Sequence, residues 1–253
     1  MMLYDSHVHT IFSVDAETTI VQAVRASEEQ RVGLVITDHM DWDFPAPFPD
    51  FRVDLPGFFR AYAPLRNEKL LLGIELGLTG KCLEKANEIA AGYDFDFVLG
   101  SVHVLDGREV GDALYLERDE REVYRVYLTE AASLLETADV DAFAHVDYPL
   151  RTTSAELPYQ EYRAEFDALF AVMLRRRIVL ELNTSRLADE AARENLLSIY
   201  RAYNACGGRY VTLGSDAHEP QEIADNFAVA ADFLWETGLI PVHFRSRKML
   251  IDQ

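Results

Sequence analysis

Cysteine and positive charge are both scarce in this chain. The two cysteines, Cys82 and Cys206, lie far apart and match neither a zinc-finger nor a redox spacing. We therefore expect free thiols in a reducing compartment rather than a disulfide framework. The 24 Lys and Arg residues are outnumbered by 43 Asp and Glu residues, which gives a formal net charge of -19. Nucleic-acid-binding surfaces need a basic footprint, so this balance argues against a nucleic-acid partner.

Long hydrophobic runs are missing too. No run of 18 apolar residues occurs, which excludes a membrane-spanning helix, and the N-terminus lacks the basic and apolar segments of a signal peptide. We expect a cytoplasmic protein with no membrane partner. No repeat, low-complexity tract or linker divides the 253 residues, of which 49% are hydrophobic and 26% charged, as in ordinary globular proteins. We therefore expect one domain over residues 1–253.

Short apolar segments alternate with amphipathic ones along the chain. Seven segments have the pattern of buried strands: 3–9, 34–37, 70–76, 97–102, 142–146, 178–182 and 210–214. Six segments between or after them have the pattern of helices: 19–30, 83–91, 121–136, 159–176, 189–203 and 221–236. This alternation predicts an α/β fold, in which helices cover a parallel sheet.

Two connections depart from this alternation. Residues 40–59 are Pro-rich and aromatic, and a connection of this length is usually functional, so we expect a loop that could act as a lid. After His103, the pair Asp106-Gly107 is typical of a tight turn, which predicts a small excursion of the chain there.

Each expected strand ends in, or leads directly into, a histidine or a carboxylate. The side chains concerned are Asp5, His7, His9, Asp38, His39, Glu75, His103, His145, Asp147, Glu181, Asp216 and His218. In an open doubly wound sheet these strand ends would lie along a line, whereas in a barrel they converge on one mouth, where barrel enzymes keep their active sites. We therefore predict a seven-stranded, TIM-like barrel with its site at the C-terminal ends of the strands.

Six of the seven histidines are at these strand ends, and this grouping indicates a metal site. The seventh, His243, lies near the C-terminus, and we expect it to be ordinary. Side chains 5, 7 and 9 leave the same face of a strand, so His7 and His9 would stand side by side, and we expect Asp5 to orient a ligand imidazole. Asp38 and His39 would point to opposite faces of a strand, so we expect a supporting role for Asp38. Histidine nitrogen is a favoured ligand of zinc and other transition metals. One catalytic zinc takes about three protein ligands. Six imidazoles, with Glu75, Asp216 and Asp15, therefore predict two or three divalent ions.

The polar motifs also follow one another in a specific order. They are Asp5-Ser-His7-Val-His9, Thr37-Asp-His39, Gly73-Ile-Glu75, Ser101-Val-His103, Ala144-His145 and Gly214-Ser-Asp216-Ala-His218. In order and spacing, over residues 5–218, they resemble the polymerase and histidinol phosphatase (PHP) family. The resemblance implies a distorted (β/α)7 barrel with a di- or trinuclear metal centre that hydrolyses phosphoesters.

The resemblance implies a set of metal ligands as well. One ion would be held by His7, His9, Glu75 and Asp216, and a second by Glu75, His103 and His145. A third would be held by His39, His218 and Asp15, a position at which some relatives have His. Zinc, manganese and iron are the expected ions, and a carboxylate at position 15 favours the harder manganese or iron.

The expected reaction is hydrolysis of a phosphomonoester by a hydroxide that bridges two ions, because metals lower the pKa of bound water. Arg151 and Arg186 follow two of the strand ends and are the candidates for phosphate binding, since Arg can contact phosphate through two parallel hydrogen bonds. Asp216, His218 and His39 are the candidate catalytic residues. Which group gives the leaving alkoxide its proton stays open.

Within the family, the chain is most similar to the stand-alone histidinol-phosphate phosphatases. Residues 94–103 (DFDFVLGSVH) and 181–185 (ELNTS) carry this similarity, although Arg186 stands where relatives often have Gly. It implies hydrolysis of L-histidinol phosphate, a step of histidine biosynthesis. This substrate carries a cationic amine, and the acids of the Pro-rich segment, Asp41, Asp43 or Asp50, are the candidates to bind it. A broader phosphatase or an exonuclease acting on nucleotides is the alternative. A non-catalytic metal-binding scaffold is less favoured, because no ligand is missing.

Overall fold

The computed structural model describes residues 2–111, 119–152 and 158–252, and its centre is a ten-stranded sheet. Seven strands pair in parallel, in the order β1 (Tyr4–Val8), β2 (Gly33–Ile36), β4 (Leu70–Gly77), β5 (Phe97–Ser101), β8 (Ala142–Phe143), β9 (Val179–Asn183) and β10 (Tyr210–Gly214). Every expected strand is present, and the α/β class is confirmed.

The predicted count of seven strands was wrong for the sheet as a whole, because three more strands join it. β3 (His39–Met40) pairs with β4, β11 (Ile240–Arg245) runs parallel to β10, and β12 (Lys248–Ile251) is antiparallel to β11. A two-residue strand is too short to show a period. All four residues of β12 are exposed, so this strand also lacks the buried apolar run by which the others were found.

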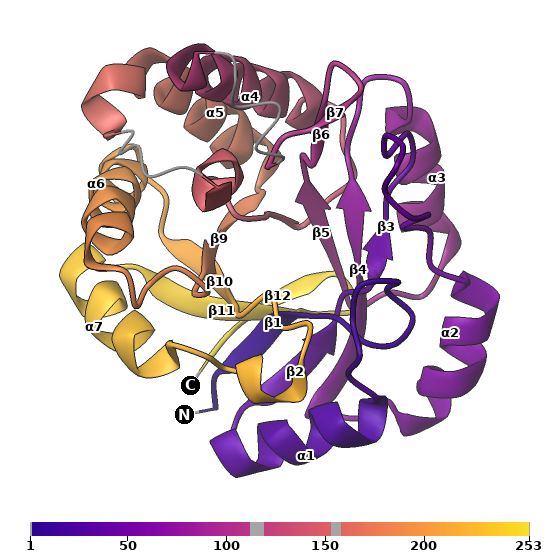
Figure 1. Cartoon of the computed structure of the whole chain (residues 1–253). Coiled ribbons are helices and arrows are strands. Elements are labelled where there is room, and N and C mark those ends of the chain that lie inside the picture. Colours follow the sequence, from indigo (N-terminus) through magenta and orange to yellow (C-terminus); the bar gives the residue numbers. More distant parts are fainter. Residues whose placement is uncertain (1, 112–118, 153–157, 253) are drawn as a thin grey trace.

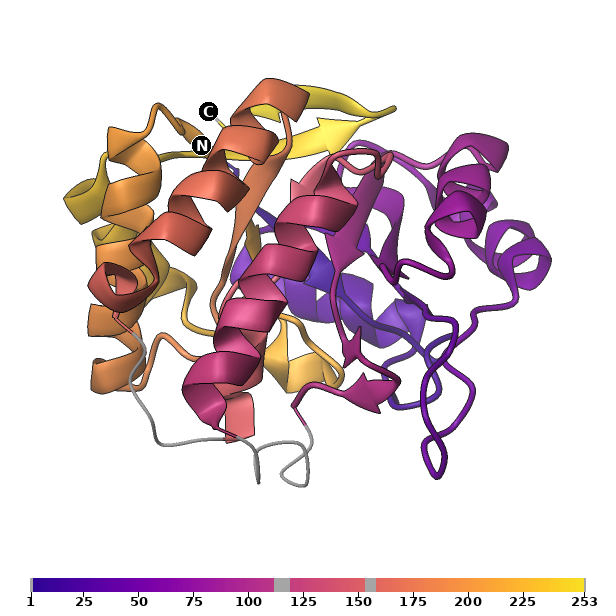
Figure 2. The same cartoon turned by 90° about the horizontal axis from the view of Figure 1, so that it is seen from above.

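The described residues form seven α-helices, which surround the sheet (Figures 1 and 2). They are α1 (Ile20–Gln30), α2 (Leu55–Tyr62), α3 (Leu83–Gly92), α4 (Glu120–Leu135), α5 (Arg163–Arg176), α6 (Glu190–Ala205) and α7 (Phe227–Thr237). Thr19, Asp119 and Asp189 cap α1, α4 and α6 by accepting backbone N–H groups of the first turn. None of these helices is both long and apolar enough to cross a membrane.

Two predicted segments need correction. Residues 40–59 are not one continuous loop, because α2 begins at Leu55, where Asp54 accepts the N–H of Gly57 and a proline occupies the first turn. The expected helix over 221–236 begins only at Phe227, after the separate 3-10 turn η5 (Pro220–Glu222). In the first case proline marked the start of a helix rather than a loop.

The parallel strands are buried on both faces. All eight residues of β4 are buried, and alternate side chains belong to different clusters: Leu70 and Leu72 pack on the helix side, and Leu71 packs with Phe97 in a second cluster. This arrangement explains why the strands are continuous apolar runs rather than alternating ones.

The end of β1, the first of the seven parallel strands, lies beside the segment that follows β10, the seventh. An isolated parallel bridge joins Val8 to Ala217, and the carbonyl oxygen of His7 accepts the N–H of Asp216 at 2.8 Å. The carbonyl of Ala217 in turn accepts the N–H of His9 at 2.8 Å. These bonds hold the end of β1 beside the segment that carries Asp216 and His218.

Two hairpins mark opposite ends of the molecule. The predicted excursion after His103 is confirmed as the pair β6 (Val104–Leu105) and β7 (Arg108–Glu109), and both turn residues, Asp106 and Gly107, have positive φ. Figure 2 shows this hairpin beyond the arrowhead of β5, whereas the β11–β12 hairpin crosses the far end of the sheet.

Candidate metal centre

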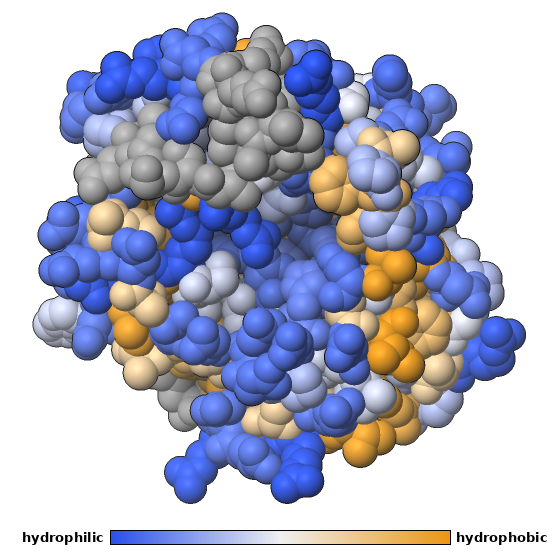
Figure 3. All heavy atoms as spheres, in the orientation of Figure 1, coloured by the Kyte–Doolittle hydropathy of each residue, from blue (hydrophilic) through white to orange (hydrophobic). Residues whose placement is uncertain are grey.

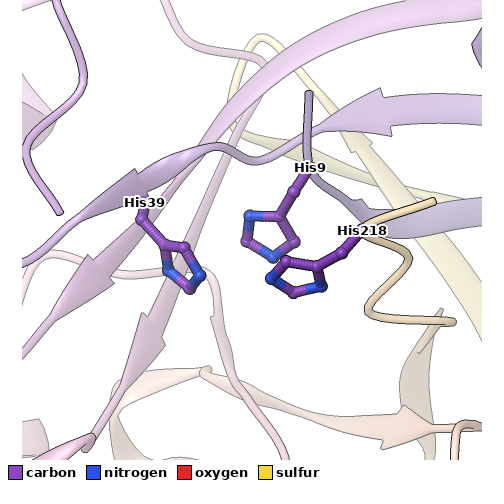
Figure 4. Close-up of side chains that lie close together, drawn as sticks. All are labelled: His9, His39 and His218. Carbon is purple, nitrogen blue, oxygen red and sulfur yellow. The ribbon is translucent and has the colours of Figure 1, made fainter. Parts of the chain in front are cut away.

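Six histidines come together where the parallel strands end. The six are His7 in β1, His9 after β1, His39 in β3, His103 after β5, His145 after β8 and His218 after β10. The ring centroids of His9 and His39, and of His9 and His218, are 4.2 Å apart. Figure 4 shows these three rings converging from three separate segments. The convergence at one mouth follows the expectation from the polar strand ends.

Glu75 of β4 lies at the centre of the cluster. It is fully buried, and five imidazoles lie within 4 Å of its carboxylate. The nitrogen to oxygen distances are 3.4 Å for His7, 3.6 Å for His9, 2.8 Å for His39, 3.2 Å for His103 and 3.1 Å for His145. One carboxylate with neighbours on both oxygens has the position that a bridging ligand needs.

Asp216 and Asp15 extend the cluster, and Asp15 connects it to His218, which does not contact Glu75. Oδ1 of Asp216 lies 3.3 Å from Nε2 of both His7 and His9, and Oδ2 of Asp15 lies 3.6 Å from Nε2 of His39 and 3.3 Å from Nε2 of His218. With these two carboxylates, the structure brings all nine predicted metal ligands into one connected cluster. Three-residue groups within it have donor atoms close enough to share an ion, among them His7–His9–Glu75, Glu75–His103–His145 and His9–His39–His218.

Several donor atoms of the cluster have no hydrogen-bond partner although they are buried. Nε2 of His7 and His9 and Oε2 of Glu75 are among them. A buried polar atom without a partner costs about 1–3 kcal/mol, so a protein tolerates several together only where something else satisfies them. Imidazole nitrogen and carboxylate oxygen are the donors that zinc, manganese and iron accept, so these residues fit a metal centre.

Two buried carboxylates orient the imidazoles from behind. Nδ1 of His7 lies 2.7 Å from Oε1 of Glu181, and Nδ1 of His103 lies 2.8 Å from Oδ1 of Asp41. Each contact holds the ring so that Nε2 is directed to the centre of the cluster. The sequence had marked Glu181 as a strand-end carboxylate, but it gave no sign of the role of Asp41, which lies in an irregular segment.

Asp5 and Asp38 bind hydroxyls and backbone N–H groups rather than imidazole rings. The expectation that Asp5 orients an imidazole was wrong: its carboxylate accepts the N–H and hydroxyl of Ser215 and the N–H of Ala224. Asp38 accepts the hydroxyls of Thr10 and Ser13, which agrees with its expected supporting role. Both carboxylates therefore fix the two segments that flank the end of β1.

The electrostatics of the cluster favour charge on its carboxylates. Burial alone would raise the pKa of Glu75, but the imidazoles of His7 and His103 outweigh it and hold this pKa well below the ordinary value. Burial acts in the same direction on Asp216, where His7 and Arg151 hold the pKa well below the ordinary value. Two carboxylates that stay ionised inside the protein form a strong cation-binding centre.

A pocket opens over the cluster, and Figure 3 shows the hollowed centre lined by hydrophilic residues. Its lining comprises Asp15, His39, His103, His145, Asp216 and His218 of the cluster, together with Phe44, Phe48, Phe51, Glu109, Tyr148 and Arg151. No sequence pattern marks Glu109 or Tyr148, because β7 has two residues and the segment after His145 is the short 3-10 turn η3 (Tyr148–Thr152).

The predicted phosphate-binding arginines differ in position. Arg151 lines the pocket, and its Nη1 lies 3.2 Å from Oδ2 of Asp216. Arg186 is not among the residues that line it, and its Nη1 donates to Oδ2 of Asp147 at 2.6 Å.

The acids proposed for the substrate amine do not line this pocket either. Asp41 is buried against His103, and all three acids line an adjacent depression that shares its phenyl rings with this pocket. His243, expected to be ordinary, pairs with Asp252 outside the cluster.

The comparisons with known proteins agree with this geometry. A family model described as PHP domain matches residues 5–185. A protein of Clostridium acetobutylicum named probable histidinol-phosphatase is 36% identical over 253 residues, covering 98% of this chain and 99% of its own. One of Deinococcus radiodurans with the same description is 31% identical, and 98% of each chain is covered.

A solved structure is similar along its whole length. The histidinol phosphate phosphatase of Lactococcus lactis, in complex with zinc, L-histidinol and phosphate, superposes with a TM-score of 0.90 at 25% identity, covering 99% of each chain.

Proposed function

We propose that this chain, which belongs to the PHP domain family, is a metal-dependent phosphatase that hydrolyses L-histidinol phosphate to L-histidinol and phosphate. One observation carries the proposal: the structural relative that binds zinc, L-histidinol and phosphate matches 99% of this chain, including the segments that bear the cluster. In addition, relatives more than 30% identical over nearly the whole chain are named probable histidinol-phosphatases.

We further propose that residues 1–253 form one domain and that its sheet closes into a distorted (β/α)7 barrel. The bridge between Val8 and Ala217 supports closure, since it links the two ends of the parallel strand order. We also propose that the protein acts in the reducing cytoplasm. The proposed reaction is a step of histidine biosynthesis, and both cysteines, Cys82 and Cys206, are free thiols, as is usual in that compartment.

The nine residues of the cluster would hold two or three divalent ions, of zinc, manganese or iron. We assign the first ion to His7, His9, Glu75 and Asp216, the second to Glu75, His103 and His145, and the third to His39, His218 and Asp15. When bound, such ions activate water and withdraw charge from a phosphate. The positions of Glu181 and Asp41 behind the rings of His7 and His103 support this assignment, because they fix which nitrogen is free to bind.

The chain's own residues would bind and orient the phosphate above the cluster. Arg151 lines the pocket beside Asp216, so its guanidinium can contact a phosphate oxygen there. Arg186 would act less directly, because its Nη1 already donates to Asp147. Asp216, His218 and His39 all line the pocket, and we propose them as the residues next to the reacting phosphate.

The proposal is tested by assaying the purified, metal-loaded protein on a panel of phosphomonoesters. We expect kcat/KM for L-histidinol phosphate to exceed that for nucleoside monophosphates and p-nitrophenyl phosphate by roughly tenfold or more. A protein equally active on the whole panel would instead be a phosphatase of broad specificity. Some more distant relatives, such as one of Vibrio cholerae at 24% identity, are named only probable phosphatase. Activity confined to single-stranded DNA would contradict both assignments.

A further inference from the structure

Glu109 is a pocket carboxylate that does not belong to the metal cluster. Three carboxylates of the described residues line the pocket: Asp15, Glu109 and Asp216. Asp15 and Asp216 each contact two or more histidines of the cluster, whereas no described histidine forms an ion pair with Glu109. Its side chain is nevertheless largely buried, with the residue 7% exposed. Glu109 is therefore a buried acid that lines the pocket and is not one of the proposed metal ligands, so it can interact with a bound substrate.

Among the described residues, the carboxylate of Glu109 is held through one oxygen, Oε1. Oε1 accepts the hydroxyl of Tyr148 at 2.5 Å and the N–H of Gly111 at 2.9 Å. Burial, and then the charge of Glu109, raise the pKa of Tyr148 well above its ordinary value, which keeps its hydroxyl a donor. Within the parts of the chain that the structure describes, Oε2 accepts no hydrogen bond. Among those residues Oε2 is the oxygen left for a ligand, and the two bonds to Oε1 fix its position.

Tyr148 separates this carboxylate from the cluster by the width of one ring. The Tyr148 ring centroid lies 5.0 Å from that of His103 and 4.8 Å from that of His145, and the guanidinium of Arg151 lies 5.4 Å from it. A phosphate bound at Arg151 and the cluster would thus leave the other end of a short substrate near Glu109.

An aromatic wall completes the pocket. Phe44 and Phe51, from the segment between β3 and α2, have ring centroids 4.4 Å apart, and Phe51 packs edge-on against His39 with centroids 5.4 Å apart. Aromatic faces accept flat rings and cations. The pocket therefore offers three different surfaces: a cation-binding cluster, a wall of phenyl rings and one carboxylate.

We propose that Glu109 binds the ammonium group of the substrate and thereby selects phosphomonoesters of amino alcohols over neutral ones. The inference rests on the proposed function in one respect, because it takes the phosphate to bind at Arg151 and the cluster. It replaces Asp41, Asp43 and Asp50, which do not line the pocket, as the amine-binding acid. The aromatic wall would then receive the imidazole ring.

The test compares Glu109→Gln with the wild-type protein on two substrates. Glutamine keeps the size of the side chain and an acceptor for Tyr148 and Gly111 but removes the charge. We expect KM for L-histidinol phosphate to rise about 10- to 100-fold more than KM for p-nitrophenyl phosphate, because a hydrogen bond to a charged group contributes about 1.5–3 kcal/mol. Both values come from the same protein sample, so their ratio does not depend on how much of it is folded. Equal changes on both substrates would overturn the proposal.

A matched control and a second substrate pair keep this test separate from the proposed function. Asp50→Asn removes an exposed acid of the adjacent depression and should leave the ratio unchanged; a selective effect there would overturn the role of Glu109. If the wild-type protein does not hydrolyse L-histidinol phosphate, the proposed function fails. Ethanolamine phosphate and propyl phosphate then serve as probes: a wild-type preference for the amine that Glu109→Gln abolishes supports the inference, and the absence of such a preference overturns it.

Discussion

The two ends of the sheet satisfy their buried carboxylates in different ways. At the end where the strands begin, guanidinium groups neutralise them: Nε of Arg66 lies 2.7 Å from Asp96, and Nε of Arg247 lies 2.5 Å from Asp141. At the end where the strands finish, Glu75 and Asp216 face mainly imidazoles, and several donor atoms there have no partner. The first arrangement is complete as it stands, and the second requires a further cation.

The two ends of the sheet therefore have different roles: the end where the strands begin contributes to stability, and the end where they finish carries the metal centre. Ser246 and Arg247 donate backbone N–H groups to Asp96, which precedes β5. Together with the Arg247–Asp141 pair, these bonds hold the β11–β12 hairpin against the start of β5 and β8. The cluster at the other end joins segments from six parts of the chain around a pocket. In barrel enzymes the C-terminal strand ends carry catalysis and the opposite ends carry stability. The comparison predicts that substitutions where the strands begin change the free energy of unfolding, and that substitutions where the strands finish change metal binding and hydrolysis.

Removal of metal should have the largest effect. We expect dialysis against a chelator to reduce hydrolysis of phosphomonoesters by roughly 10³-fold, because bound metal supplies several kcal/mol of transition-state stabilisation. Zinc or manganese added back should restore activity. The midpoint of thermal unfolding should also fall, since a ligand that binds only the folded state stabilises it. Full activity of protein shown to be metal-free by elemental analysis would contradict the assignment of the cluster.

Replacement of Glu181 by glutamine should have an intermediate effect. Glu181 accepts from His7 through Oε1 and from the backbone N–H of His145 through Oε2, so the change weakens the support of two proposed ligands at once. We expect a 10- to 100-fold loss of metal affinity, measured by competition with a chromophoric chelator. Glu136→Gln, at an exposed pair with Arg175, is the matched control. Equal affinities in the two variants would show that Glu181 does not support the metal site.

Much of this architecture is predictable from sequence, because a buried strand and a polar strand end are both local signals. The seven parallel strands are predicted from their apolar runs, and eight of the nine clustered residues are predicted because each lies at a strand end or within a motif. Asp15 lies in neither, and only the family resemblance pointed to it. Convergence of strand ends then turns positions far apart in the chain into one site. This prediction of the site did not require knowledge of any tertiary contact.

The features that were missed depend on tertiary contacts. Glu109 lies in a two-residue strand, and its importance comes from Tyr148 and the pocket rather than from its neighbours in sequence. Asp5 looked like a support for an imidazole, but the backbone of Ser215 and Ala224 approaches it instead. Only α2 had an overlooked local signal, namely Asp54 followed by a proline in the first turn.

Replacement of Asp141 by asparagine should have the smallest effect on catalysis. Asp141 lies at the stable end of the sheet, so we expect kcat/KM to stay within about threefold of the wild type. Stability should change in a pH-dependent manner, because burial, which outweighs the neighbouring Arg247, raises the pKa of Asp141 to about 6. The folded protein therefore holds this proton more tightly than the unfolded chain, and the contribution of Asp141 to stability declines as pH rises from about 4 to about 6.

Asparagine cannot ionise, so the variant should gain stability relative to the wild type over that same interval. Urea unfolding of both proteins at pH 4.5, 5.5 and 7 measures the difference. A gap between the two free energies of unfolding that is independent of pH would show that Asp141 is ionised throughout, held by Arg247. A loss of kcat/KM comparable to that of Glu181→Gln would instead show that the two ends of the sheet are coupled, because a change confined to the stable end would then have reached the metal centre.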